Sequence, residues 1–460
     1  MKRPPLKTLP AELNINTARG MALEILNRVV LTDAYAEPLL DAYLSRGQLP
    51  NIHEQKLATH LVYGVLRTQG HLDWIIRTIY RGDFNSLDIP IINIIRTGLY
   101  QLLYTNRIPP SAAVNEAVNL AKVCKPAGAA LVNAILRNYL RRREGLVYPS
   151  LKEDPEEYLV VMHSHPRWLV RRWLEVFGRE KTLALCVANN EIPPATLRVN
   201  SLKVTREAAA LELKQEGLEV GQTTFSADGL VIARGAASLR ATKSFQQGHV
   251  LRQDEASQLI SQLLEPRPGE LNLDLCAGQG LKATHLAERM GNKGKVFALD
   301  NNVGKLAALR GLAARQGIGI IETWEGDATT DLGSAWHNKF DRILVDAPCS
   351  GLGTVRRNPE IKWRCQMRHL QAASILQKKI LHNAATYLRR GGTMIYSVCT
   401  IMPEENEEVL EDFLSRHSDF CLAPVQDGRW PGMDAPGGFM RTGMKGQEMD
   451  GFFAAVMIKK

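Results

Sequence analysis

The chain has 460 residues, which is too long for one hydrophobic core and corresponds to about three domains of roughly 100–200 residues each. Its 57 Lys and Arg against 48 Asp and Glu give a net charge of +9, while 45% hydrophobic and 23% charged residues exclude wholesale disorder. No apolar run approaches the roughly 18 residues of a membrane span, so we expect no membrane association. Residues 1–150 carry 18 Lys and Arg against 11 Asp and Glu, which predicts either a polyanionic partner or a solvated basic face.

The cysteines and the amino terminus favour a cytoplasmic protein. The seven cysteines are an odd number without any CxxC pair, which argues against both a disulfide framework and a zinc ribbon. Residues 1–20 are basic, but no apolar stretch follows them, so we expect no secretory signal. The 11 histidines lack the spacing of metal ligands, and we therefore expect no metal site.

The first third of the chain has the pattern of a helical bundle. Thr17 is a candidate N-cap for a first helix whose apolar residues recur every three or four positions. No strand alternation follows, and the spacing predicts about six to eight helices. The further candidate helices span residues 53–68, 70–80, 88–104, 111–124 and 127–142.

The rest of the chain combines helices with strands. Residues 146–250 predict a small α+β unit, with helices at about 166–177, 179–189 and 205–216 and alternating stretches at 196–200 and 229–233. From residue 251, strands and helices alternate, which predicts a doubly wound parallel sheet. Its strand candidates span residues 271–275, 295–299, 320–324, 342–345, 393–396 and 452–458. We therefore predict domains at residues 1–145, 146–250 and 251–460.

A glycine-containing loop follows the first strand of the predicted parallel sheet. Residues 274–282 read DLCAGQGLK, in which Gly278 and Gly280 allow a tight turn and the close approach of a ligand. The helix that follows offers unpaired N–H groups to a carboxylate or phosphate. Taken alone, this pattern also fits an ordinary structural turn.

Acidic residues follow the next three strands. Asp300 lies about 20 residues after the loop, where a carboxylate can accept hydrogen bonds from two ribose hydroxyls. Asp327 follows the third strand and Asp346 the fourth. Each acid alone also fits a turn or an N-cap, but their succession after consecutive strand ends predicts a nucleoside pocket.

Two cysteines also follow strands, where ligands bind in doubly wound sheets. A lone cysteine is usually a small buried hydrophobe, but Cys349 and Cys399 at one pocket edge predict thiolate chemistry. Between them, residues 356–364 place four cations around Trp363, which suits phosphate contacts and base stacking.

Several of these motifs are similar to those of the Sun-type (Nol/Nop/Sun) family of RNA cytosine-5 methyltransferases. The most specific are DAPCSGLGT at residues 346–354, RNPEIKW at 357–363 and YSVC at 396–399. The first third resembles a NusB-type RNA-binding module, and the middle segment resembles the small RNA-recognition-like extension of the family. The resemblance implies a multidomain fold with an all-α NusB-like bundle, a small α+β domain and a Rossmann-like α/β methyltransferase domain.

The resemblance also implies S-adenosylmethionine (AdoMet) as the cofactor. Asp300 would hold its ribose, Asp327 would lie on the adenine side, and Asp346 would lie near the methyl donor and the target base. The loop around its methionine end would comprise Cys276, Ala277, Gly278, Gln279, Gly280, Leu281 and Lys282.

The family pattern makes Cys399 the nucleophile that adds to C6 of the cytosine, while Cys349 helps to release the product. Lys282 would fix the carboxylate of Asp346, which can hydrogen-bond the base edge. We therefore expect methylation at C5 of a cytosine in small-subunit (16S) ribosomal RNA, with no obligatory protein partner.

The loop departs from the family pattern, and other functions stay open. Gln279 and Leu281 replace residues of the usual Pro-Gly-Gly-Lys loop, and a positive φ at Leu281 would cost about 1–2 kcal/mol. One alternative is an RNA-binding assembly or antitermination-type factor with a vestigial methyltransferase domain. Another is the same reaction on transfer RNA or DNA. Because DNA cytosine-5 enzymes take their nucleophile from a Pro-Cys motif, a DNA substrate would promote Cys349.

Overall fold

The chain forms two compact units. Residues up to 191 together with the segment 355–364 form unit 1, and residues 192–354 together with 365–460 form unit 2. No helix among the described residues is long and apolar enough to cross a membrane. The computed structural model describes residues 16–426, 429–430, 436–443 and 448–460, so the basic stretch at residues 1–15 lies outside the described residues.

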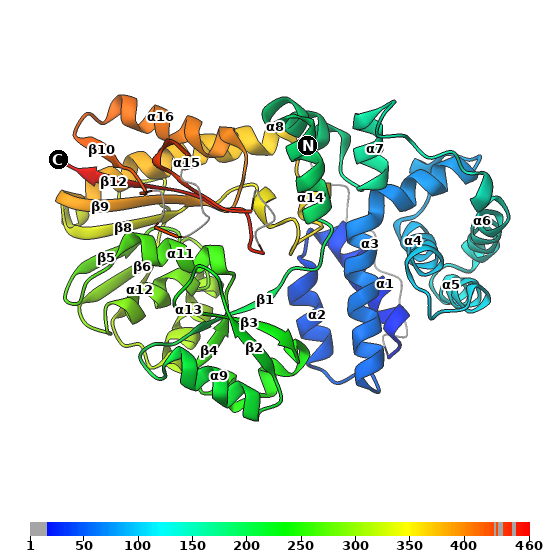
Figure 1. The fold of residues 1–460 in the computed structure, drawn as a ribbon, viewed down its shortest axis with the longest axis horizontal. Helices are drawn as coiled ribbons and strands as arrows, with labels where there is room; N and C mark the ends of the chain where they lie inside the picture. The colour runs from blue at the N-terminus through cyan, green and yellow to red at the C-terminus, as the bar shows by residue number, and fades with distance from the viewer. Residues whose placement is uncertain (1–15, 427–428, 431–435, 444–447) are drawn as a thin grey trace. The chain divides into compact units, whose positions relative to one another are not determined.

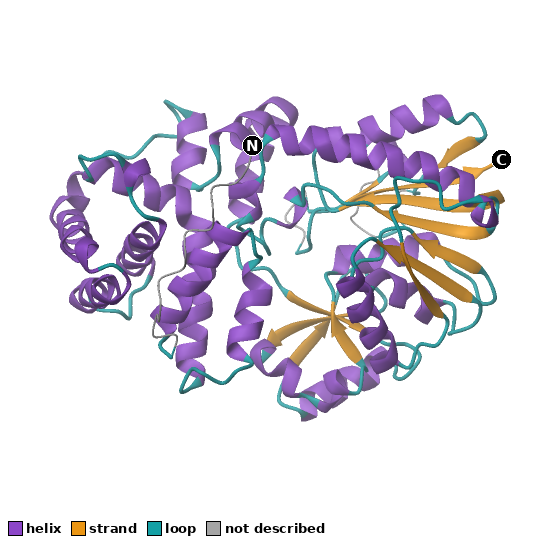
Figure 2. Cartoon of the chain, turned by 180° about the vertical axis from the view of Figure 1, so that it is seen from behind, coloured by secondary structure: helices purple, strands orange, loops and turns teal. Residues whose placement is uncertain are grey.

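Unit 1 is built from helices, as the first third of the sequence predicts (Figure 2). Residues 16–145 form six α-helices, within the predicted number. Two short helices of this unit, α2 and α7, are not predicted, because nine and eight residues leave little room for a periodic pattern. The helices are α1 (Ala18–Thr32), α2 (Ala36–Leu44), α3 (Ile52–Ile79), α4 (Ile89–Tyr104), α5 (Pro110–Cys124), α6 (Ala129–Arg142), α7 (Pro155–Met162), α8 (Arg167–Ala188) and α14 (Ile361–Arg364).

Two glycines of unit 1 have different roles. The predicted break before Gly70 is wrong, because α3 runs through it. The Gly70 N–H donates to Ser164 Oγ at 2.7 Å, and a Cβ at this position would lie 2.9 Å from the ring of Trp363, so the glycine permits close packing. Gly178 has a φ of +75° and interrupts α8, which confirms the predicted boundary between two helices there.

Unit 2 begins with a small antiparallel sheet of four strands in the order β2-β3-β1-β4. Helix α9 (Arg206–Gln215) accompanies it, so the predicted α+β character is confirmed. The short strands β2 and β4 are not predicted. Helices α7 and α8 group with unit 1, and the domain boundaries given above stay predictions. The strands are β1 (Ala195–Val199), β2 (Glu219–Gln222), β3 (Gly229–Arg234) and β4 (Val250–Arg252).

The rest of unit 2 is an eight-stranded sheet flanked by helices (Figure 1). Its main path has the order β10-β12-β9-β8-β5-β6-β7, and β11 pairs with β12. The strands are β5 (Leu271–Asp274), β6 (Lys295–Asp300), β7 (Ile321–Glu325), β8 (Phe340–Asp346), β9 (Leu388–Val398), β10 (Phe420–Ala423), β11 (Met440–Arg441) and β12 (Phe453–Lys459). The helices are α11 (Glu255–Leu264), α12 (Leu281–Arg289), α13 (Val303–Gln316), α15 (Met367–Tyr387) and α16 (Glu407–Arg416).

The prediction of a wholly parallel sheet is wrong at one edge. Strands β9, β8, β5, β6 and β7 are parallel, whereas β12 runs antiparallel to both β9 and β10. A parallel neighbour requires a crossover, usually a helix. The described residues between β10 and β12 contain no α-helix, so nothing seen there carries the chain back across the sheet.

Alternating side chains of the central strands build a core on each face of the sheet. Ile343 and Val345 of β8 pack into the core that includes α15 and α16, whereas Leu344 packs with α11, α12 and α13 on the other face. Figure 1 shows these two groups of helices on opposite sides of the sheet. Because both faces are covered, the inner stretches of β6, β8 and β9 are apolar, as in Ile343–Val345 of β8.

Arg198 of β1 connects the small sheet to the segment that follows β5. Its side chain is fully buried, and Nη2 lies 2.9 Å from both Glu288 Oε1 and Thr284 Oγ1 of α12. Nη1 donates to the carbonyl oxygen of Leu281 at 2.5 Å and to the side chain of Gln253. The guanidinium therefore fixes the start of α12 from the side of the small sheet.

We expect Arg198→Ala to lower the free energy of unfolding by about 3–5 kcal/mol, because the buried Glu288 carboxylate loses its cation. Burial already raises the pKa of Glu288, so its ionisation weakens the fold as the pH rises through that pKa. The loss should therefore be larger at about pH 8 than at about pH 5, as measured by urea unfolding. Arg234→Ala, which removes an exposed partner of Glu219, is the control and should leave stability nearly unchanged. Equal losses in both variants would contradict the role of Arg198.

Candidate active site

The predicted acids and cysteines lie at the carboxyl edge of the parallel strands. Asp300 is the last residue of β6, Asp346 is the last residue of β8, and Cys399 directly follows β9. Asp327 lies two residues beyond β7, and Cys349 lies three residues beyond β8. Because these strands are neighbours, one edge of the sheet carries all of these residues.

The loop between β5 and α12 has the backbone conformation that its glycines predict. Gly278 and Gly280 have φ values of +56° and +86°. The Gly280 N–H donates to the carbonyl oxygen of Ala277 at 2.9 Å. The Ala277 N–H donates to the carbonyl oxygen of Leu299, also at 2.9 Å. The Gly278 N–H donates to Asp300 Oδ2 at 3.0 Å. The acid at the end of β6 therefore helps to hold the loop.

The strain considered for Leu281 does not arise. Leu281 is the first residue of α12 and has no positive φ, because Gly280 takes the left-handed conformation as the N-cap. Its side chain is 37% exposed, and that of Gln279 is exposed as well. The two departures from the family pattern therefore leave the backbone of the loop unstrained.

Lys282 and Asp346 form an ion pair at this edge. Lys282 Nζ lies 2.7 Å from Asp346 Oδ2, as predicted, and Ser397 Oγ donates to Asp346 Oδ1 at 2.8 Å. Burial opposes the charge of Lys282, but its interactions with Asp346 and Cys399 outweigh burial and raise the pKa of Lys282. The lysine is therefore held in its charged form by Asp346 and Cys399.

Asp274, the last residue of β5, is a buried acid that the sequence analysis does not assign to the site. Its Oδ1 accepts from the Cys276 N–H at 3.4 Å, while its buried Oδ2 has no hydrogen-bond partner among the described residues. Burial, followed by the charge of Asp346, raises the pKa of Asp274 to about 7. A bound ligand is one way to satisfy a buried oxygen of this kind.

The two predicted cysteines meet at this edge. The Sγ atoms of Cys349 and Cys399 are 3.3 Å apart, and both side chains are half-buried. The hydrogen bond to Cys399 and burial raise the pKa of Cys349 well above its ordinary value. Burial also raises the pKa of Cys276, which fits a contribution from its backbone rather than its sulfur.

Asp327 is more exposed than the other acids of this edge. Its Oδ1 accepts from both the N–H and the hydroxyl of Thr329, each at 2.8 Å. These hydrogen bonds lower the pKa of Asp327. The residue therefore holds its own turn, and its contact with a cofactor stays a prediction.

Comparisons with known proteins assign the chain to a family. Residues 261–458 match the family described as 16S rRNA methyltransferase RsmB/F, residues 16–141 match the NusB family, and residues 165–238 match the RsmF/B-like ferredoxin-like domain. A ribosomal RNA small subunit methyltransferase B from Pseudomonas syringae pv. tomato is 37% identical over 413 residues, which are 89% of this chain and 90% of that one. The chain belongs to the 16S rRNA methyltransferase RsmB/F family.

Solved structures are similar to this RsmB/F family member over different lengths. The crystal structure of PH0851 is 26% identical, covers 100% of both chains and has a TM-score of 0.83. NSun6 from Pyrococcus horikoshii with SFG is 22% identical, covers 65% of this chain and 99% of that one, and has a TM-score of 0.57, which shows a shared fold. The predicted fold of a NusB-like, a small α+β and a methyltransferase part is confirmed.

The predicted RNA-binding role of residues 356–364 is wrong for the side chains around Trp363. This segment belongs to unit 1, where Lys362 is fully buried and its Nζ donates to the carbonyl oxygen of Arg67 at 2.9 Å. Trp363 Nε1 donates to the carbonyl oxygen of Leu66 at 2.8 Å. Burial lowers the pKa of Lys362 to about 7. These groups bind backbone carbonyls of this RsmB/F family member and cannot reach phosphates at the same time.

Two residues that the sequence analysis passes over lie within its own motifs. Asp274 opens the loop motif, and Ser397 stands two residues before Cys399. Residues two apart on a strand share a face, so this spacing could have placed Ser397 beside Cys399. The burial of Asp274 depends on contacts that the motif itself does not show.

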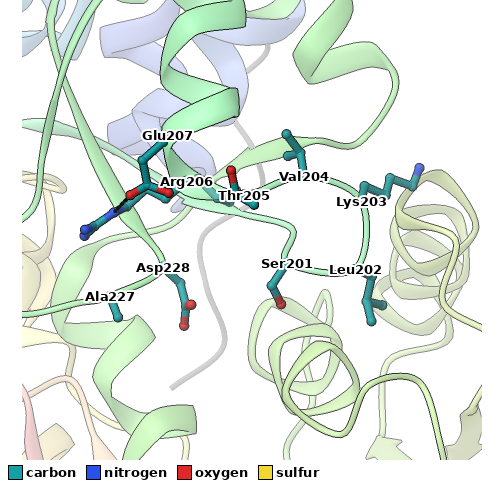
Figure 3. A pocket seen from close by; sticks show the side chains of 10 residues that line it. Ser201, Leu202, Lys203, Val204, Thr205, Arg206, Glu207, Ala227 and Asp228 are labelled. Carbon is teal, nitrogen blue, oxygen red and sulfur yellow. Dashed lines mark ion pairs between the residues drawn. The ribbon is translucent and has the colours of Figure 1, made fainter.

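A pocket of about 470 Å³ lies by the small sheet and is separate from this site (Figure 3). Arg206 and Glu207, whose side chains pair at 3.5 Å, line it together with Asp228 and the chain between β1 and α9. None of the predicted site residues lines this pocket. Within the part of the chain that the structure describes, no three His, Cys, Asp or Glu side chains gather as metal ligands.

We expect Gly280→Ala to lower the free energy of unfolding by more than the roughly 1–2 kcal/mol of left-handed strain. The added Cβ would also lie 2.3 Å from Leu309 Cγ, whereas at Gly278 nothing lies within 4 Å, so Gly278→Ala should cost the strain alone. Leu281→Gly should cost less than about 1 kcal/mol. Urea unfolding followed by circular dichroism ranks the three variants, and a greater loss in Leu281→Gly than in Gly280→Ala would refute this assignment of the loop.

Proposed function

We propose that this chain transfers a methyl group from AdoMet to C5 of a specific cytosine in 16S ribosomal RNA through a covalent bond between Cys399 and C6. The observation that carries the proposal is the pair of sulfurs 3.3 Å apart beside the Lys282–Asp346 ion pair. The names of the family and of the Pseudomonas syringae relative support the RNA substrate. The NSun6 structure contains SFG, an AdoMet analogue, which supports the cofactor.

The residues of the β5–α12 loop fit AdoMet. Gly278 leaves open space where a side chain would stand, and Asp274 has a buried oxygen without a partner among the described residues. We assign residues 276–282 to the methionine end, Asp300 to the ribose and Asp327 to the adenine side. When bound, AdoMet supplies an electrophilic methyl carbon on a sulfonium sulfur.

The two cysteines divide the remaining chemistry. The Cys399 thiolate adds to C6, and the C5=C6 electron pair becomes available at C5. The covalent bond thus splits the difficult methylation of an aromatic carbon into easier steps. Asp346, fixed by Lys282 and Ser397, can hydrogen-bond the polar edge of the base. After methylation, a base accepts the C5 proton, the C–H bond pair restores C5=C6, and the S–C6 bond pair returns to Cys399. We assign Cys349 to assist this release.

The helical part and the small sheet supply RNA contacts in this proposal. The segment 1–145 carries most of the net positive charge and would grip phosphates, so its affinity should fall as salt rises. The segments 146–250 and 251–460 would contribute the remaining recognition and the chemistry. No obligatory protein partner and no metal enter the proposal, and the cytoplasm is the expected location.

Cysteine substitutions test the assignment of the nucleophile. We expect Cys399→Ala to abolish methyl transfer, because no bond to C6 can form, and Cys349→Ala to accumulate a protein–RNA adduct because release fails. Transfer of labelled methyl groups to 16S RNA measures turnover, and a denaturing gel detects the adduct. Cys421→Ala, a half-buried cysteine on β10, is the control. The reverse pattern would make Cys349 the nucleophile.

Two further measurements separate the alternatives. We expect AdoMet to bind in calorimetry, because the loop backbone is unstrained; no detectable heat at millimolar ligand would favour an RNA-binding factor with a vestigial methyltransferase domain. Bisulfite sequencing of ribosomal and transfer RNA from a deletion strain should show the loss of one 5-methylcytosine in 16S RNA. A loss in transfer RNA alone would support the same reaction on another substrate.

A further inference from the structure

A buried carboxylate lies behind the two cysteines. Glu405 ends a short 3-10 helix, Pro403–Glu405, and its side chain has no exposed surface. Oε1 accepts from the Ser350 N–H at 2.7 Å and from Gln377 Nε2 at 3.1 Å, while Oε2 accepts from the Ser350 hydroxyl at 2.5 Å. Its own carbonyl oxygen accepts from the Tyr396 hydroxyl at 2.6 Å. The glutamate is therefore bound to three separate elements.

The partners of Glu405 adjoin both cysteines. Ser350 directly follows Cys349, and its Oγ lies 3.0 Å from the Oγ1 of Thr400, which directly follows Cys399. Gln377 of α15 donates to the carbonyl oxygen of Pro348 at 2.9 Å as well as to Glu405. One carboxylate thus holds the Cys349 loop directly and meets the Cys399 loop through Ser350 and Thr400.

The Cys349 and Cys399 loops are joined both by backbone hydrogen bonds and by these side-chain contacts. The loops come from different strands, β8 and β9, and the cysteines are 50 residues apart in the chain. The Cys349 loop leaves β8 as irregular backbone and is bonded to the other loop at two points, where the N–H groups of Ala347 and Gly353 donate to the carbonyl oxygens of Ser397 and Cys399 at 2.9 and 3.0 Å. The Ser350 N–H and hydroxyl also bind the buried Glu405, and charge-assisted hydrogen bonds of this kind are short and strong.

We propose that Glu405 is a positioning residue that sets the Cys349 loop against Cys399, and so determines how fast the methylated base is released. The inference rests on the proposed function, because it requires that one cysteine forms the adduct and the other assists its breakdown. Glu405 touches neither sulfur and acts through Ser350. Its loss should slow release while leaving the cofactor loop, which it does not contact, intact.

Three variants test this inference in the full-length protein. Glu405→Gln keeps the shape but replaces an acceptor oxygen by a donor that faces the Ser350 hydroxyl. Ser350→Ala keeps the carboxylate and removes one hydrogen bond to it. Glu408→Gln removes one negative charge from an exposed position on α16 and is the matched control. Each is compared with the wild-type protein in methyl transfer to 16S RNA, adduct accumulation and AdoMet calorimetry.

We expect kcat to fall by about 10- to 100-fold in Glu405→Gln, because misplacing a reacting group by about 1 Å can cost 100-fold. The AdoMet dissociation constant should stay within about twofold of wild type. KM for RNA should fall together with kcat, because slow breakdown of an accumulating adduct lowers both and leaves kcat/KM nearly unchanged. Both Glu405→Gln and Ser350→Ala should accumulate adduct, to a smaller extent than Cys349→Ala. Glu408→Gln should behave as wild type.

Two outcomes would overturn the inference. The first is that Ser350→Ala turns over like wild type and accumulates no adduct. This result overturns the inference even if Glu405→Gln does not fold. The second is that Glu405→Gln loses AdoMet binding and turnover in parallel, with no change in adduct, because a purely structural role of Glu405 predicts that result. If wild type itself transfers no methyl group to RNA, the proposed function fails, and that result is distinct from either.

Discussion

The site depends on the ion pair between Lys282 and Asp346. The lysine lies in the first turn of α12 and the aspartate ends β8, so their contact at 2.7 Å fixes the segment after β5 against the next strand. Ser397 of β9 holds the second oxygen of Asp346. A largely buried pair offsets its desolvation only when its geometry is good and its remaining groups are satisfied. The ends of three elements are therefore held in one arrangement.

The same cation sets the charge balance of this edge. Asp274 and Asp346 are two acids near one lysine, and the pKa of Asp274 rises to about 7 because it is buried close to Asp346. When both acids are ionised, Asp274, Asp346 and Lys282 together have a net negative charge. Under the proposed function, the cofactor brings a sulfonium and an ammonium, which this charge would favour. Protonation of Asp274 would weaken that attraction.

The loop between β5 and α12 is held from a second side by Arg198 of the small sheet. Its buried guanidinium binds the Leu281 carbonyl oxygen and two side chains of α12. The fold of the small sheet and the shape of the loop are therefore not independent, although their sequences are far apart. Burial of the Arg198–Glu288 pair makes this connection rigid, because neither charge can return to water without unfolding the interface.

Local sequence predicts those features that local chemistry determines. Gly278 and Gly280 require left-handed backbone, and residues that follow parallel strands must meet at one edge, so the loop, the acids and the two cysteines could be placed without coordinates.

The burial of residues 356–364 could not be predicted from the sequence. Four cations around a tryptophan suggest a solvent-facing surface, whereas Lys362 is buried through contacts with residues almost 300 positions away. The direction of β12 also depends on its distant partners. The contacts of Glu405 could not be predicted either, because they join residues that are distant in the sequence. Only the folded chain shows that this carboxylate binds Ser350 after Cys349, and that Ser350 contacts Thr400 after Cys399. The residue types at this edge can thus be identified from short motifs, while their geometry depends on the burial of charged groups by residues far away in the chain.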